Sequence, residues 1–208
     1  MRWLAVLRRD LAARGFGGLA LPAAAGVVVA AGFGGLCEAA VTPASGVVAA
    51  WLGVLIAASL GAGCAFDPER DGMWAFRATP LSAGALFAAK SACVALTAGL
   101  GAAGALAATA FFVDARAALA AWPLAALAVV AVSFAGTALG AAGEGRLSRA
   151  EGWLALLPLF LPYVFLGASG TVKAMAGESA APEAAALSGA ALVGWAVGSA
   201  VFGKVLWG

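Results

Sequence analysis

Residues 117–142 read AALAAWPLAALAVVAVSFAGTALGAA, a stretch of apolar and small residues without a charged side chain. It is long enough to cross the hydrocarbon core of a bilayer, which takes about 20 helical residues. Membrane β-barrels instead need alternating segments of about ten residues. Similar continuous runs lie near 16–36, 45–65, 81–113, 152–171 and 184–206. The sequence therefore predicts an all-α membrane protein with six transmembrane helices in a single domain, 1–208.

The overall composition supports the same class of protein. Of the 208 residues, 64% are hydrophobic and 11% are charged, with a mean hydropathy of +1.02, whereas soluble domains carry about 25% charged residues. So few charged side chains cannot cover the surface of a soluble domain of this length. The small net charge of +2 and the lack of a basic run with interleaved aromatic residues argue against a nucleic-acid partner.

Catalytic and metal chemistry have little support in the sequence. Histidine is absent, and with it the commonest general base and metal ligand. Cys37, Cys64 and Cys93 are far apart and match neither a CxxC pair nor a disulfide framework, so we expect small core residues. We therefore predict a chain that is not an enzyme and holds no cofactor and no metal.

Two motif-like segments do not change this prediction. The segment GASG at 167–170 is similar to the serine motif of rhomboid intramembrane proteases, but no histidine is present to accept the serine proton. We interpret it as a chance turn of small residues. The segment GALFAAKS at 84–91 differs from the Walker pattern at Ala89, and it enters a long apolar helix whose amides are already bonded.

The basic residues predict how the helices are oriented, because cytoplasmic flanks collect Lys and Arg. With the N-terminus inside, only Arg116 and Lys173 lie outside, so both termini are predicted to be cytoplasmic. The ten basic residues assigned to the inside are Arg2, Arg8, Arg9, Arg14, Arg70, Arg77, Lys90, Arg146, Arg149 and Lys204. We expect Lys90 to lie at the cytoplasmic interface with its side chain snorkelling outward.

Acidic residues are expected only in the loops, which argues against a proton-coupled carrier. Glu38, Asp114, Glu178 and Glu183 are assigned to the outside loops and the others to the inside loops. Energy for any transport would then have to come from a partner.

Glycine and proline predict features of the helix packing. Gly136 with Gly140, and Gly194 with Gly198, form GxxxG pairs typical of closely packed membrane helices. Pro158 and Pro162 each remove a backbone donor from the fifth run, which predicts a broken or kinked helix there.

Two segments are predicted to lie at the membrane surface. Residues 1–15 are expected to form an amphipathic interfacial helix that carries its charges along the membrane and is anchored by Trp3 and Leu7. The loop FDPERDGMWAFRATPL at 66–81 is the richest polar stretch, and Pro68 can begin a short helix there. A helix with one apolar and one charged side, facing the cytosol, is one interpretation. A solvated connector with an aromatic membrane anchor is the other.

Three parts of the chain together resemble the CcmB family, the membrane subunit of the ABC-type complex of cytochrome c maturation. They are the N-terminal W…RRDL pattern, the loop at 66–81 and the run LLPLFLPYVFLG at 156–167. The residues that match the family one by one are Trp3, Arg8, Arg9, Asp10, Leu11, Asp71, Gly72, Pro80, Leu81 and Lys90. Ala75 departs from the family, which commonly has a glutamate at this point.

The resemblance implies an ABC-2-like permease bundle in the bacterial inner membrane, without a catalytic site of its own. Segment 66–82 would then be the coupling loop that receives force from a separate ATPase. The implied ATPase-coupling residues are Glu69, Arg70, Asp71, Gly72, Met73, Trp74, Phe76, Arg77 and Pro80. The implied interfacial residues are Trp3, Arg8, Arg9, Asp10 and Lys90, and the implied helix kink lies at Pro158 and Pro162.

The implied partners are the cytoplasmic ATPase CcmA, the heme-handling subunit CcmC, the small subunit CcmD, the lipid bilayer and, indirectly, the heme chaperone CcmE. In that family the complex uses ATP to release the heme-loaded chaperone, and older accounts describe heme export. Two alternatives stay open. One is a homodimeric ABC-2 exporter permease for a lipid, drug or polysaccharide, and the other is a membrane scaffold that transports nothing.

Overall fold

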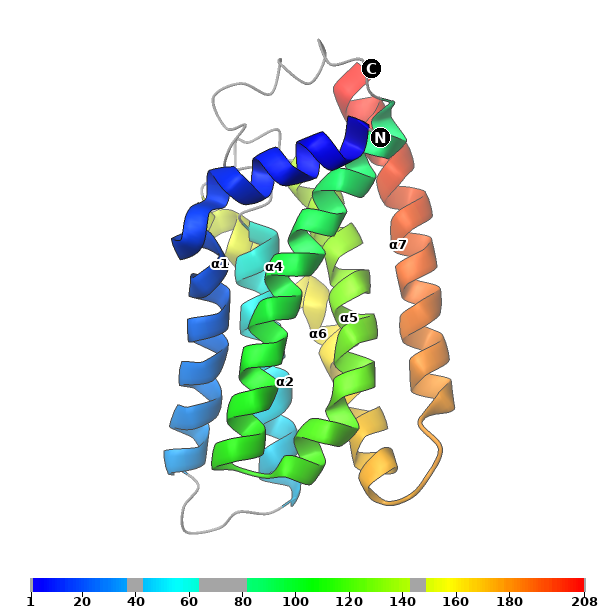
Figure 1. Ribbon diagram of the computed structural model, residues 1–208. Helices are drawn as coiled ribbons and strands as arrows, with labels where there is room; N and C mark the ends of the chain where they lie inside the picture. The colour runs from blue at the N-terminus through cyan, green and yellow to red at the C-terminus, as the bar shows by residue number, and fades with distance from the viewer. Residues whose placement is uncertain (1, 37–42, 64–81, 143–148, 208) are drawn as a thin grey trace.

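The computed structural model describes residues 2–36, 43–63, 82–142 and 149–207. These residues form helices that pack side by side as an up-and-down bundle (Figure 1). The helices are α1 (Arg2–Leu36), α2 (Pro43–Gly63), α4 (Ala83–Phe112), α5 (Ala115–Ala142), α6 (Arg149–Met175) and α7 (Ala181–Trp207). The prediction of an all-α chain is confirmed for the described residues.

The helices have the length and apolarity of membrane spans. Five of them qualify singly, and a sixth span is present if the two halves of α1 count as one. The chain is thus built as a multi-pass membrane protein. The beginning of α1 and the end of α7 lie at the same end of the bundle, which we call the N-terminal end; we call the opposite end the far end (Figure 1).

Helix α1 bends sharply at Gly15. This residue has φ 59° and ψ −174°, a conformation open essentially to glycine alone. The segments Leu4–Gly15 and Ala20–Gly32 make an angle of 63°. As a result, the first half of α1 crosses the N-terminal end of the bundle while the second half runs down beside α4 (Figure 1). The bend falls where the sequence separates the segment 1–15 from the first span.

Helix α4 lies at the centre of the packing and contacts α1, α2, α5 and α7. Close backbone approach makes this possible. A Cβ at Gly101 would lie 2.6 Å from the Cβ of Ala57 in α2 and 3.1 Å from Pro22 in α1. Since such distances exclude any side chain, small residues allow three helices to meet here. The large buried side chains Trp51, Phe87, Phe160 and Phe202 fill the space between the helices elsewhere.

The predicted close packing at the GxxxG pairs is confirmed at Gly136 and Gly198, and Gly194 lies at an ordinary contact distance from α5. A Cβ at Gly136 would lie 2.6 Å from the Cβ of Ala62, and one at Gly198 would lie 2.5 Å from the ring of Phe87. Gly194 faces the Cβ of Phe134 at 3.4 Å. These glycines bring α5 against α2, and α7 against α4 and α5.

The expectations about α6 and α7 have different outcomes. Helix α6 runs unbroken through Pro158 and Pro162, so of the predicted break or kink only the kink stays a prediction. Two other expectations are wrong. The GASG segment at 167–170 is not a turn but lies inside α6. Glu183 is not in a loop, because it belongs to the first turn of α7.

Candidate functional site

A buried ion pair joins the first half of α1 to α4 at the N-terminal end. The Nζ atom of Lys90 lies 2.7 Å from Oδ2 of Asp10, and the two side chains are 0% and 2% exposed. Arg9 stands beside the pair, with its guanidinium 2.9 Å from Oδ1 of Asp10 and its side chain 55% exposed. Asp10 is therefore contacted by two cations: Lys90, which is fully enclosed, and Arg9, which reaches the surface.

The local sequence explains why Asp10 faces inward. In the first half of α1, exposure changes with the period of a helix. Val6, Leu7, Asp10, Leu11 and Arg14 lie on the covered side, and Leu4, Ala5, Arg8, Arg9, Ala12 and Ala13 are exposed. The covered side packs onto α4 and carries one acidic and one basic residue, so the helix docks through charges as well as through apolar packing of Val6.

A second polar contact follows one turn later along α1. The Nη1 atom of Arg14 donates to the Thr97 hydroxyl at 3.1 Å, and Thr97 in turn donates to the carbonyls of Cys93 and Val94 at 3.0 Å. Thr97 is fully buried in α4. Asp10 and Arg14 thus contact α4 at Lys90 and Thr97, and the two contacts fix the register of the helices.

The prediction that Lys90 snorkels outward is wrong. Its side chain is fully buried, because the first half of α1 crosses α4 at this point and supplies the carboxylate of Asp10. Removing one partner of such a pair strands a buried charge, which costs about 3–5 kcal/mol, although the intact pair need not add stability over an apolar replacement. The arrangement therefore specifies where α1 docks.

A second group of polar side chains connects helices at the far end. Lys173 in α6 forms an ion pair with Oε1 of Glu183 in α7, and the hydroxyl of Ser169 also reaches Glu183 at 3.4 Å. On the inner side of α6, the indole of Trp51 donates to the Thr171 hydroxyl at 3.0 Å. These contacts hold α6 to α7 and to α2.

Gly167, the first residue of the GASG segment, has a packing role. A Cβ at this position would lie 1.9 Å from Cη2 of Trp51, so the indole occupies the space of the missing side chain. The hydroxyl of Thr171 donates to the Gly167 carbonyl at 2.7 Å. The missing side chain at Gly167 therefore leaves the space in which the indole of Trp51 packs against α6.

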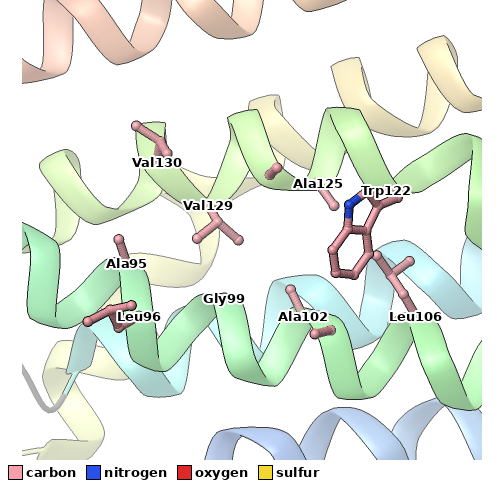
Figure 2. A pocket seen from close by; sticks show the side chains of 11 residues that line it. Ala95, Leu96, Gly99, Ala102, Leu106, Trp122, Ala125, Val129 and Val130 are labelled. Atoms are coloured by element: carbon pink, nitrogen blue, oxygen red, sulfur yellow. The ribbon is translucent and has the colours of Figure 1, made fainter.

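An apolar groove lies between α4 and α5 on the outer surface of the bundle. It has a volume of about 240 Å³, and Trp122 stands at one end of it, next to Leu106 (Figure 2). The lining residues are Ala95, Leu96, Gly99, Ala102, Ala103, Leu106, Trp122, Ala125, Ala126, Val129 and Val130. No charged or nucleophilic side chain lines it, so it offers room for an apolar group but no chemistry.

The described residues bring only part of the predicted site together. Arg9, Asp10 and Lys90 meet at the N-terminal end, and Trp3 and the exposed Arg8 are in the same half of α1. The predicted coupling residues Glu69, Arg70, Asp71, Gly72, Met73, Trp74, Phe76, Arg77 and Pro80 lie outside the described residues, as do Cys37 and Cys64. Cys93 is buried in α4, as expected for a core residue.

Sequence reasoning missed the pairing of Asp10 with Lys90, although two signals point to it. A lysine inside an apolar run needs a partner, and Asp10 is the only acidic residue before Glu38. The contacts of Arg14 with Thr97 and of Trp51 with Thr171 have no comparable signal, because Ser and Thr are common in membrane helices.

No family model, no curated protein and no solved structure matches the chain. Among the described residues, no group of three or more His, Cys, Asp or Glu side chains is placed to hold a metal ion.

Proposed function

We propose that the chain is the permease-like transmembrane subunit of an ABC-type complex for cytochrome c maturation, and that it couples ATP hydrolysis by a separate ATPase to release of a heme-loaded chaperone. The buried pair of Asp10 and Lys90 carries the proposal. It joins the N-terminal RRDL segment to the lysine that follows the 66–81 loop, and these are two of the places on which the resemblance to CcmB rests.

The pair gives the coupling segment a mechanical route into the bundle. Segment 66–82 leads directly into α4, whose first turn is capped by Ser82, since its hydroxyl oxygen accepts from the Ala85 amide at 3.3 Å. A push on the segment therefore moves the beginning of α4. Lys90 passes this movement to the first half of α1 through Asp10, and packed helices shift as rigid bodies.

Isolation of the tagged chain from membranes tests the proposal. We expect a cytoplasmic ATPase and a heme-handling membrane protein to co-purify with it. Recovery of a second copy of the chain with an ATPase, but without a heme-handling protein, would favour a homodimeric exporter instead. A complex whose ATPase activity is indifferent to the chain would favour a scaffold.

Two sets of variants separate docking from transmission. Asp71→Arg in the loop should reduce the amount of ATPase that co-purifies. Asp10→Leu combined with Lys90→Met should keep the ATPase bound but lower chaperone release per ATP hydrolysed, because the link between α4 and α1 is lost. Glu178→Arg, at an exposed position near the far end, is the matched control and should change neither quantity. Wild-type values for all of these variants would contradict the coupling route.

A further inference from the structure

The exposed side of the first half of α1 has an unusual composition, and we refer to it as the arginine face. It consists of Leu4, Ala5, Arg8, Arg9, Ala12 and Ala13. Two adjacent arginines stand among small or apolar residues, and no acidic residue is present. The acidic residue of this half of α1, Asp10, lies on the covered side against Lys90. Arg9 also donates to Asp10 through Nε and Nη2, but its side chain is 55% exposed, and Asp10 offers one negative charge to two cations. The arginine face therefore presents positive charge outward.

The length of α4 places this face at the depth of the lipid headgroups. The helix has 30 residues and is about 45 Å long, whereas the hydrocarbon core is about 30 Å thick and the headgroup regions bring the total to about 40–45 Å. Asp114 and Arg116 lie just beyond its far end and fix the hydrocarbon boundary near Phe112. The surplus length of α4 is therefore at its beginning.

Lys90 is the eighth residue of α4, within this surplus. The first half of α1 docks on Lys90 through Asp10 and crosses the bundle instead of pointing away from it (Figure 1). It consequently lies along the membrane surface, at the level of the phosphate groups. Leu4 is 41% exposed, which suits the boundary between headgroups and acyl chains.

We propose that the arginine face binds the phosphate groups of anionic phospholipids in the adjacent leaflet. The guanidinium group forms paired hydrogen bonds with phosphate oxygens, and the negative surface potential of such a leaflet adds to the attraction. The exposed residues Leu21 and Val28, below the bend in α1, provide an apolar surface for the acyl chains of the same lipids. This proposal does not depend on the proposed coupling function.

Lipid retention by the purified full-length chain tests the proposal. The chain is incubated with phosphatidylglycerol or phosphatidylcholine of identical acyl chains, and bound lipid is counted by native mass spectrometry. Wild type should prefer phosphatidylglycerol. Each arginine near a charged surface contributes a factor of about five in affinity, so Arg8→Gln should lower the preference about fivefold. Arg8→Gln with Arg9→Gln should lower it further, but by less than a second factor of about five, because Arg9 also contacts Asp10.

Matched variants make each outcome informative. Arg116→Gln removes an exposed arginine at the far end and should leave the preference unchanged. Arg8→Lys with Arg9→Lys should retain most of it, and salt at about 1 M should abolish it because the screening length falls to about 3 Å. If the glutamine variants fail to fold, the wild-type comparison and the lysine variant still decide the question.

Three results would overturn the proposal. The first is equal retention of both lipids by wild type, and the second is an unchanged preference in the folded glutamine variants. The third is displacement of bound phosphatidylglycerol by inorganic phosphate at similar concentration, which would assign the face to a soluble anion. If the glutamine substitutions release a soluble protein partner but leave lipid retention intact, the face is a protein interface.

Discussion

Single residues decide how α1 is attached to the bundle, and Asp10 is the most sensitive of them. Asp10→Asn removes the carboxylate and leaves the fully buried Lys90 without it, so we expect a loss of roughly 3 kcal/mol or more in the free energy of unfolding. Lys90→Met should cost less, because Arg9 lies 2.9 Å from Asp10 and still compensates its charge. Thermal unfolding of the purified variants in detergent measures both effects.

A double-mutant cycle separates the pair from its surroundings. Asp10→Leu with Lys90→Met replaces both charges by apolar groups and should recover most of the lost stability. If the stability loss of the double variant equals the sum of the losses of the two single variants, the pair does not act as a unit.

Gly167 is the second position at which a single-residue change should alter stability. The Cβ of Gly167→Ala would collide with the indole of Trp51, so we expect a loss of about 1–3 kcal/mol in stability. Trp51→Leu in the same chain should relieve the collision and recover part of this loss. Gly189→Ala is the control, because nothing lies within 4 Å of its Cβ and alanine favours the helix. Similar thermal stabilities of the Gly167 and Gly189 variants would contradict the packing role.

At the scale of the element, the bend in α1 controls whether its first half lies across the bundle. Gly15→Ala places a side chain where φ is 59° and ψ is −174°, which costs about 1–3 kcal/mol. Because the bend is needed for Asp10 to reach Lys90, the loss should be smaller when Lys90→Met is already present. Gly17→Ala, at a position with open space around its Cβ, should be nearly neutral. Thermal unfolding of the four variants checks this coupling, and strictly additive losses would refute it.

The elements themselves could be predicted well from the sequence, and their contacts could not. Uncharged runs of span length predict helices because the membrane allows few alternatives, so α2, α4 and α5 lie close to their predicted ranges. The pattern of the sequence does not show the burial of Lys90, because this burial depends on how the bend at Gly15 directs the first half of α1 across α4. Likewise, Gly167 and Trp51 are far apart in the sequence, and no local pattern shows that they fit together.

The whole molecule has an uneven distribution of charge between its two ends. Arg8, Arg9 and Lys204 are exposed near the N-terminal end, and Asp114 and Glu178 lie near the far end together with Arg116. Since positively charged flanks stay in the cytoplasm, the N-terminal end should face the cytosol. The rule that was applied above to the sequence is applied here to the charged side chains that the structure places at each end of the bundle.

Cysteine labelling in intact cells tests this orientation. In a chain with Cys37, Cys64 and Cys93 replaced by alanine, Arg116→Cys should react with a membrane-impermeant maleimide added outside, because this side chain is exposed at the far end. Lys204→Cys, exposed near the N-terminal end, should react only after the membrane is permeabilised. Both sites are exposed, so a difference reports sidedness and not burial. The opposite pattern would place both chain ends outside the cytosol and would rule out contact between segment 66–82 and a cytoplasmic ATPase.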